Sequence, residues 1–290
     1  MDNIKTISVD KRSMLLASII GDGEITKIYH GSRRKNNSYR EHFSMNQLEY
    51  RIWKTKQLRE YFYLTQQSSC LRSKSLPLFT SLFPFFYDET GEKHIPIDLL
   101  KYCTSFYFLL VLYLDDGSLI LSKRINHRSK KIYLMPAISF YLQCYKKNEL
   151  ELLGHFISEQ FKYELKLNKR NDGNGYILKM TKTKDVYRFL NEVKSTISNC
   201  ESMRYKFDWE YRFNVEKEKL QLDYPSYSVI ETDSSRFSNY TEKEVMDIIR
   251  LKLEGQTDQA IAYYLNRTYW SVVYKIKDLR KKGCFLDNNS

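Results

Sequence analysis

Two near-copies of a nine-residue segment lie 94 positions apart, from Asp22 to Asp116, and they constrain the fold more than any other feature of the chain. Residues 15–23 read Leu-Leu-Ala-Ser-Ile-Ile-Gly-Asp-Gly, and residues 109–117 read Leu-Leu-Val-Leu-Tyr-Leu-Asp-Asp-Gly. Each apolar run is long enough for about three helical turns. The glycine after each aspartate favours a helix stop in a left-handed turn. The pattern therefore predicts two buried helices, each with an aspartate at its carboxyl end.

The first copy predicts that the two helices pack side by side. Ala17 and Gly21 are four residues apart on one face, and small residues at this spacing let two helix backbones approach closely. In that arrangement Asp22 and Asp116 meet at one end of the seam. Paired carboxylates are typical of Mg²⁺ sites that hydrolyse phosphodiesters. The alternative is two ordinary core helices that each end in aspartate, but a second copy in a matching context favours the paired site.

Further segments extend the pattern beyond the two copies. Residues 85–96 read Phe-Phe-Tyr-Asp-Glu-Thr-Gly-Glu-Lys-His-Ile-Pro, and residues 203–206 read Met-Arg-Tyr-Lys. With both copies and in this order, the chain resembles a LAGLIDADG homing endonuclease that carries two repeats in one polypeptide, over about residues 1–225. The resemblance implies an α+β fold in which two pseudo-symmetric αββαββα repeats, at 1–100 and 101–228, form a DNA-binding saddle.

The resemblance also implies a metal site. Asp22 and Asp116 would ligate two or three Mg²⁺ ions, and the main-chain carbonyls of Gly21 and Asp115 would be additional metal ligands. A metal-bound water would attack each scissile phosphate in line. Asp115 and Asp116 are neighbours on a helix and point about 100° apart, so only one of them faces the metal. Asp116 is the choice because it aligns with Asp22.

Four further residues are predicted to act near the metals. Lys93 and Lys206 occupy positions at which the family has basic residues that organise water and offset developing charge. Gln47 and Gln143 follow the strands of the groove and are assigned polar positioning roles. Val111 departs from the family pattern, which has a small residue there, and this departure predicts a wider or offset helix seam.

The segments after each copy predict the same order of elements. In the first repeat we expect strands at 24–29 and 42–45 and a helix at 49–63. Its inward positions would be Ile52, Leu58 and Phe62.

In the second repeat we expect strands at 118–124, 137–141, 163–169 and 176–181, and a helix at 149–161. Asn148 would cap that helix, with Leu150, Leu153 and Ile157 inward.

Basic turns lie between the predicted strands of both hairpins. If the strands curve over a duplex, alternate side chains face the major groove and the turns reach phosphates or base edges. Solvated turns are the plainer alternative. The predicted DNA-contacting residues here are Arg33, Arg34, Lys35, Arg124, Arg128, Lys130 and Lys131.

Composition agrees with a nucleic-acid partner. The 290 residues carry a formal charge of +12 with a pI near 9.2, and DNA phosphate is the expected polyanion. Five scattered cysteines support neither a disulfide framework nor a zinc site. Since the chain has no apolar run of about 20 residues and no signal core, we expect an intracellular protein without a membrane partner. The resemblance, with both repeats in one polypeptide, implies a monomer. Its compartment would be cytoplasm or nucleoid in a bacterium or phage, or an organelle if an organellar intron encodes it.

The last sixty residues predict a separate domain at 239–290 after a linker at 229–238. Thr241 and Glu244 form a capping box that opens a helix to about Glu254, and further helices are expected at 257–265 and 268–282. Three short helices resemble a Myb-like helix-turn-helix, and a small interaction domain is the alternative. The inward residues would be Ala260, Ile261, Leu265, Val272, Ile276 and Leu279, and the DNA contacts Arg267, Tyr269 and Lys275.

Three functions fit these features. A site-specific, metal-dependent double-strand DNA endonuclease requires both aspartates, which are present. A group I intron RNA maturase shares the fold and the acids, so intron RNA stays an alternative partner. A transcription regulator on the same scaffold usually loses the acids. An intein is disfavoured, because the chain ends lack its splicing residues.

Overall fold

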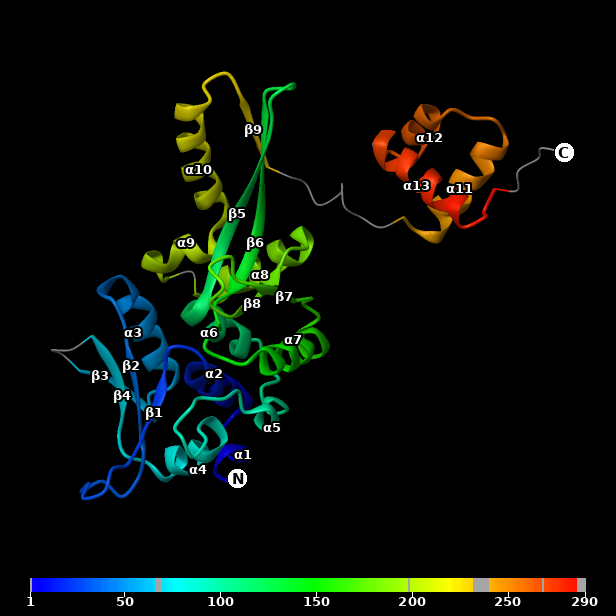
Figure 1. Cartoon of the computed structure of the whole chain (residues 1–290). Helices are drawn as coiled ribbons and strands as arrows, with labels where there is room; N and C mark the ends of the chain where they lie inside the picture. The colour runs from blue at the N-terminus through cyan, green and yellow to red at the C-terminus, as the bar shows by residue number, and fades with distance from the viewer. Residues whose placement is uncertain (1, 66–68, 198, 232–239, 268, 286–290) are drawn as a thin grey trace. The chain divides into compact units, whose positions relative to one another are not determined.

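The computed structural model describes residues 2–65, 69–197, 199–231, 240–267 and 269–285. The chain divides into two compact units, Met1–Thr232 and Asp233–Ser290 (Figure 1). Each unit has its own hydrophobic core. In the described part of the chain, no helix combines the length and apolar character needed to cross a bilayer.

Two buried helices form the centre of the first unit. Helix α2 (Val9–Ile20) packs along α6 (Tyr107–Asp116) (Figure 1). Residues 15–20 and 109–115 of the two motif segments are buried. A Cβ on Gly21 would lie 2.8 Å from the Cβ of Asp115, so glycine is needed where the helix ends approach each other. The predicted pair of core helices is confirmed.

The glycines that follow the two aspartates differ from the prediction. Neither Gly23 nor Gly117 has the left-handed backbone expected of it. A Cβ on Gly23 would overlap the ring of Tyr39, and a Cβ on Gly117 would overlap the ring of Tyr113. These glycines make room for aromatic rings at the point where each helix passes into a strand.

The first repeat forms a four-stranded antiparallel sheet in the order β1-β2-β4-β3. Its strands are β1 (Glu24–Thr26), β2 (Ser38–His42), β3 (Phe62–Leu64) and β4 (Cys70–Ser73). Its other elements are α1 (Asp2–Lys5), η1 (Met45–Gln47), α3 (Leu48–Gln57), α4 (Pro77–Phe86) and α5 (Ile97–Leu100). Helix α3 ends before residue 63 because residues 62–64 belong to β3. Leu58 and Phe62 are buried as predicted, but Ile52 is exposed.

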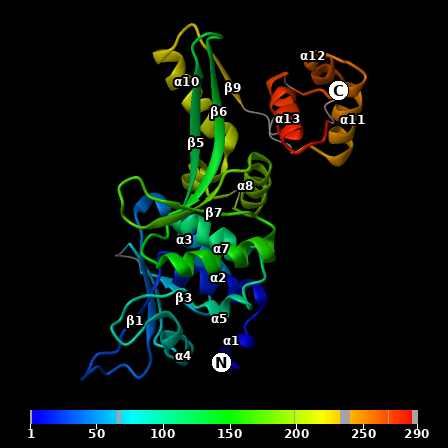
Figure 2. The ribbon, with the colours of Figure 1, turned by 45° about the vertical axis from the view of Figure 1, so that its right-hand side comes forward.

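The second repeat forms a larger sheet in the order β5-β6-β8-β7, with β9 paired in parallel to β6. Its strands are β5 (Gly117–Asn126), β6 (Lys131–Phe140), β7 (Lys166–Lys169), β8 (Tyr176–Met180) and β9 (Ser228–Glu231). Its helices are α7 (Lys147–Phe161), α8 (Thr183–Ile197), η2 (Glu201–Met203), α9 (Arg204–Phe207) and α10 (Trp209–Asp223). The β5–β6 hairpin extends well beyond β7 and β8, and α10 runs beside it (Figures 1 and 2). The predicted α+β fold with two repeats is confirmed.

Three expectations for the second repeat have mixed outcomes. Leu150, Leu153 and Ile157 are buried as predicted. Asn148 is not the cap of α7, because the helix begins at Lys147 and the Glu149 carboxylate accepts from the backbone nitrogen of Lys146. Residues 229–231, expected in the linker, pair with β6 as part of β9. The rest of that linker lies outside the described residues.

Strand register shows which positions of the two repeats correspond. Glu24 pairs with Arg40 in the first hairpin, and Ser118 pairs with Ser139 in the second. The motifs and first strands therefore correspond at a spacing of 94 residues. The second strands, and the helices α3 and α7 that follow them, correspond at a spacing of 99. The longer spacing arises because the second hairpin contains five more residues.

The second unit is a three-helix domain. Its helices are α11 (Glu242–Leu253), α12 (Asp258–Tyr264) and α13 (Tyr269–Lys281). The Thr241–Glu244 capping box is confirmed. The buried core contains Ile248, Ile261, Ala262, Val272, Ile276 and Leu279. Leu265 packs partly against it, whereas Ala260 is exposed, contrary to prediction, because Ala262 occupies the inward position.

Candidate active site

The two motif aspartates lie at corresponding helix ends. Asp116 is the last residue of α6, and Asp22 lies two residues beyond the end of α2. Burial, followed by the negative charges of Asp22 and Asp115, raises the pKa of Asp116 to about 7. Burial and the charge of Asp115 also raise the pKa of Asp22. The fold thus gathers like charges in a partly dehydrated space, which favours a bound cation.

Lys93 binds the carboxyl end of the first motif helix. Its Nζ donates to the carbonyl oxygens of Ile20 at 3.3 Å, Gly21 at 3.0 Å and Gly23 at 2.9 Å. The last carbonyls of a helix have no partner within the helix and carry partial negative charge, so a cation is stabilised there. Burial lowers the pKa of Lys93.

Lys206 binds the second motif helix in the same way. Its Nζ donates to the carbonyl oxygens of Leu114 at 2.6 Å and Asp115 at 3.2 Å, which correspond to Ile20 and Gly21 of the first repeat. Burial lowers the pKa of Lys206 to about 8. The structure therefore places one lysine at each helix end. The carbonyls of Gly21 and Asp115, predicted to ligate metal, accept hydrogen bonds from these lysines.

The Asp115 side chain belongs to a buried cluster of four charged groups that the sequence analysis did not identify. Arg51 Nη1 lies 2.8 Å from both Asp115 Oδ1 and Glu41 Oε1. Lys54 Nζ lies 2.9 Å from Asp115 Oδ1 and 3.0 Å from Glu41 Oε1. All four side chains are fully buried. We call Glu41, Arg51, Lys54 and Asp115 the buried charge cluster.

The buried charge cluster reaches one of the motif aspartates directly. Arg51 Nη2 lies 2.6 Å from Asp22 Oδ2, and the Asp22 side chain is 27% exposed. The carboxylates of Asp22, Glu41 and Asp115 are close enough together to hold an ion, but Arg51 and Lys54 already bind their oxygens. The sequence contained one indication of this cluster. Arg51, Lys54 and Leu58 recur at helical spacing, so they share one face of the helix, and Leu58 is a core residue. Two charged residues on the same face as a core residue could have indicated buried charges.

The second repeat has apolar core residues at the corresponding positions. These positions are Phe140 for Glu41, Leu150 for Arg51, Leu153 for Lys54 and Gly21 for Asp115. Phe140, Leu150 and Leu153 are all buried. The interior beside the end of the first motif helix is therefore charged, whereas the corresponding interior of the second repeat is apolar.

Gln47 and Gln143 do not occupy corresponding positions. Gln47 corresponds to Lys146, and its Oε1 accepts from the backbone nitrogen of Ser44 at 3.4 Å. Gln143 corresponds to Ser44. The orientation of its side-chain amide that satisfies its hydrogen bonds has the oxygen accepting from Arg170 Nη1 at 3.1 Å. Their catalytic roles stay predictions.

Tyr141 directly follows β6, and His42, the last residue of β2, occupies the corresponding position in the first repeat. The backbone nitrogen of Tyr141 donates to the carbonyl oxygen of Asp116 at 2.8 Å, and His42 is exposed at the corresponding position. Sequence reasoning missed both, because their place depends on the strand register.

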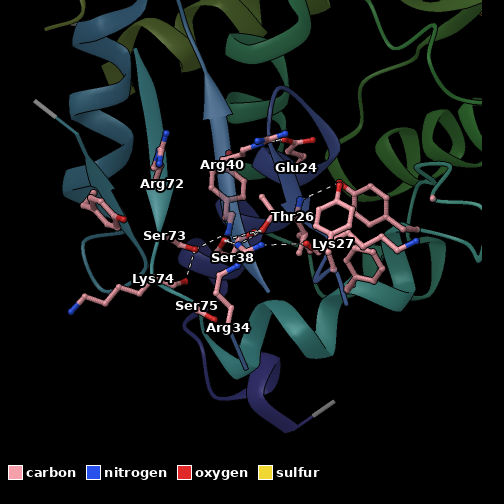
Figure 3. A pocket seen from close by; sticks show the side chains of 17 residues that line it. Glu24, Thr26, Lys27, Arg34, Ser38, Arg40, Arg72, Ser73, Lys74 and Ser75 are labelled. Atoms are coloured by element: carbon pink, nitrogen blue, oxygen red, sulfur yellow. Dashed lines mark hydrogen bonds and ion pairs between the residues drawn. The ribbon is translucent and has the colours of Figure 1, made fainter. Parts of the chain in front are cut away.

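The polar face of the first sheet lines a groove of about 700 Å³ (Figure 3). Glu24, Arg40, Arg72 and Tyr63 form one row across its four strands, and Arg40 is paired with Glu24. Arg34, a predicted DNA contact, lies against this sheet. Its Nη1 donates to the hydroxyls of Thr26 and Ser38 at 3.0 and 2.9 Å.

The other predicted DNA contacts are placed as follows. The exposed group is Arg33, Lys35, Arg124, Arg128, Lys130 and Lys131, all on or beside the hairpin turns. In the second unit, Arg267 is mostly buried, pairs with Glu244 at 2.9 Å and lies over the ring of Tyr240. Tyr269 is 42% exposed, and Lys275 Nζ lies 3.7 Å from Asp278 Oδ2. Arg267 therefore has a structural contact that the sequence did not reveal.

A sequence model of the LAGLIDADG DNA endonuclease family matches residues 12–187, which include both motif helices and most of both sheets. The chain belongs to the LAGLIDADG DNA endonuclease family. It is accordingly a DNA-cleaving hydrolase. A search among curated proteins found no match.

The fold is similar to those of solved homing endonucleases. The homing endonuclease I-WcaI bound to its DNA recognition sequence is 21% identical, with a TM-score of 0.51 over 70% of this chain and 87% of that chain. The I-LtrWI LAGLIDADG homing endonuclease bound to target DNA is 11% identical, with a TM-score of 0.43 over 74% and 96% of the two chains. I-DmoI in complex with DNA and Ca is 18% identical, with a TM-score of 0.38 over 64% and 90%.

Proposed function

We propose that this LAGLIDADG endonuclease cuts both strands of a specific DNA site in a reaction that depends on Mg²⁺. The observation that carries the proposal is the pair of aspartates at corresponding helix ends, each accompanied by a lysine on the last carbonyls. The raised pKa of Asp116 supports a divalent cation, because it reports carboxylates crowded together in a partly dehydrated space. Hard oxygen donors are the ligands that Mg²⁺ prefers.

The aspartates, the lysines and the basic turns have different roles in this proposal. Asp22 and Asp116 would hold the divalent ions, which when bound supply Lewis-acid stabilisation and a more acidic water. Lys93 and Lys206 hold positive charge at each helix end, where it offsets negative charge that develops on a phosphate. The exposed basic turns and the polar sheet faces bind the duplex.

Neutralising each aspartate tests this proposal. Asp22→Asn and Asp116→Asn should each abolish or severely slow the cutting of a target selected from a randomised duplex library in Mg²⁺, with DNA binding largely retained. Asp98→Asn, which changes an exposed aspartate in α5, is the matched control and should cut normally. Normal cutting by both active-site variants would refute the assignment. Binding without cutting by the wild-type protein would favour the transcription regulator, and selective binding of intron RNA would favour the maturase.

We further propose that the second unit is a helix-turn-helix that binds DNA beside the cleavage site. Its three helices form a small core, and α13 is rich in cations. These cations are Lys275, Lys277, Arg280 and Lys281, and Lys282 follows directly after the helix. A tethered second binding unit raises affinity through effective concentration without entering the chemistry.

Truncation near Ser235 tests the role of the second unit. The truncated protein should bind more weakly, protect a shorter footprint and show a flatter salt dependence, because fewer phosphates are neutralised. Its cleavage rate at saturation should stay nearly unchanged. An identical footprint and salt slope would favour a protein-interaction domain.

A further inference from the structure

The interiors beneath the two motif aspartates differ in charge although the backbone positions correspond. The interior beside Asp22 contains the buried charge cluster, which consists of Glu41, Arg51, Lys54 and Asp115. The corresponding set in the second repeat is Phe140, Leu150, Leu153 and Gly21. An apolar interior is thus compatible with this scaffold, and packing alone does not require the charges.

The buried charge cluster is electrically balanced within itself. It contains two carboxylates and two cations, and each of the four contacts both groups of opposite charge. Tyr50 also donates to Asp115 Oδ1 at 2.9 Å, and Tyr39 donates to Glu41. Buried ions are costly unless they are paired in this way. The cluster therefore holds the Arg51 guanidinium at a fixed position.

The second terminal nitrogen of Arg51 leaves the cluster and binds Asp22. Arg51 Nη2 contacts Asp22 Oδ2 at 2.6 Å, while Nη1 remains bound to Asp115 and Glu41. Lys54, the other cation, contacts Glu41 and Asp115 but is not paired with Asp22 among the ion pairs of the described residues. In the second repeat Leu150 stands where Arg51 would stand, and leucine offers no such bond to Asp116.

We propose that Arg51 is a positioning residue that orients the Asp22 carboxylate and makes the two halves of the active site unequal, so that the two DNA strands are cut at different rates. This inference rests on the proposed metal-dependent double-strand cleavage. A carboxylate held through one oxygen presents the other in a fixed direction. In the described part of the chain, no ion pair or side-chain hydrogen bond holds the Asp116 carboxylate, and Lys93 and Lys206 act on it only through their charge. Removal of Arg51 therefore slows one strand more than the other.

Two charge-balanced double variants test the proposal. Arg51→Met with Glu41→Gln removes one cation and one anion and leaves the Lys54–Asp115 pair. Lys54→Met with Glu41→Gln removes the same charges but keeps Arg51 on Asp22. Each DNA strand carries its own label, and both strand rates are measured in single-turnover experiments. Ca²⁺ titrated into the protein–DNA complex by calorimetry adds a reading that does not involve cutting.

The proposal expects a difference between the two double variants. With Arg51 replaced, one strand should slow by about tenfold, the other by less than threefold, and Ca²⁺ binding should weaken. With Lys54 replaced, the ratio of strand rates should stay at the wild-type value. Arg51→Lys keeps the charge of the cluster balanced but removes the second terminal nitrogen that binds Asp22. If the Arg51→Met double variant is too unstable to assay, Arg51→Lys is compared with the Lys54→Met double variant instead.

Two results would overturn the inference. An unchanged strand ratio and Ca²⁺ affinity after Arg51 replacement, while the wild-type protein cuts both strands, would make the cluster purely structural. Equal changes in both double variants would lead to the same conclusion. Wild-type protein that cuts neither strand in Mg²⁺ would instead refute the proposed function, and the inference with it.

Discussion

The two repeats of the first unit have the same scaffold but different interiors. An aspartate lies at the end of α6 and another lies two residues beyond the end of α2, and both helices have a lysine on the corresponding carbonyls. Below these ends one repeat has a balanced set of buried ions, and the other has phenylalanine and leucines. The comparison shows that the backbone places the carboxylates, whereas the side chains beneath them set how each carboxylate is held.

The sheets differ as well. The first has strands of three to five residues, and the second has a hairpin with two strands of ten residues each, whose distal part pairs with β9. The longer hairpin carries the exposed basic turn of the second repeat, which we propose contacts the duplex. It also shifts the spacing of corresponding residues from 94 to 99.

Replacing matched interior residues should give the largest difference in stability between the repeats. Arg51→Met should lower the free energy of unfolding by about 3–5 kcal/mol, because it leaves buried carboxylates with too few partners. Leu150→Met, at the corresponding position, conserves apolar volume and should cost less than about 1.5 kcal/mol. Denaturant titrations of both variants measure the difference. Equal losses would mean that the cluster tolerates an unpaired charge.

The lysines test whether the two helix ends work alike. Lys93→Ala and Lys206→Ala should each slow single-turnover cleavage by about 10²-fold with a modest change in DNA affinity, because each removes one charge-stabilising group. Lys184→Ala, which removes an exposed lysine of α8, is the control and should cut at the wild-type rate. A lower cleavage rate in only one variant would mean that the two helix ends do not work alike. Unchanged cleavage rates in both variants would mean that the two lysines have only a structural role.

The helix seam should respond to a single methyl group. Gly21→Ala places a Cβ 2.8 Å from the Cβ of Asp115 and should lower the free energy of unfolding by about 1–3 kcal/mol. Gly154→Ala in α7 meets only an ordinary contact at 3.5 Å and should be neutral or stabilising by about 0.5–1 kcal/mol. Melting curves of the pair distinguish the seam from an ordinary helix position. A neutral Gly21→Ala would show that the helix ends can separate.

The pH dependence of metal-free protein should show the smallest effect. Because the folded state raises the pKa of Asp116 to about 7, ionised Asp116 destabilises the fold above that pH, and protonation relieves this as the pH falls toward 4. Asp116→Asn should therefore be more stable than wild type at pH 8 by about 1–2 kcal/mol, with the advantage shrinking toward pH 5. Urea titrations at both pH values measure it. A constant advantage would mean that Asp116 does not titrate in this range.

Local patterns were predicted well from the sequence. The two motif helices, the aspartates at their ends and the Thr241 capping box depend on residues within a few positions of one another. Helical periodicity also identified Leu150, Leu153 and Ile157. The structure places Lys93 and Lys206 on the last carbonyls of the two motif helices, and their catalytic roles stay predictions.

Only the tertiary structure decided which distant residues meet. The cluster joins Glu41, Arg51 and Lys54 of the first repeat to Asp115 of the second, and no periodicity links a strand and a helix to a motif more than sixty residues away. Gln47 and Gln143, both predicted to act near the metals, do not occupy corresponding positions, because the unequal hairpins change the register. Local sequence determined the elements and the placement of the motif carboxylates, because short-range sterics and periodic burial act within a segment. Charge pairing across the core depends on three-dimensional packing, and it therefore appeared only in the folded chain.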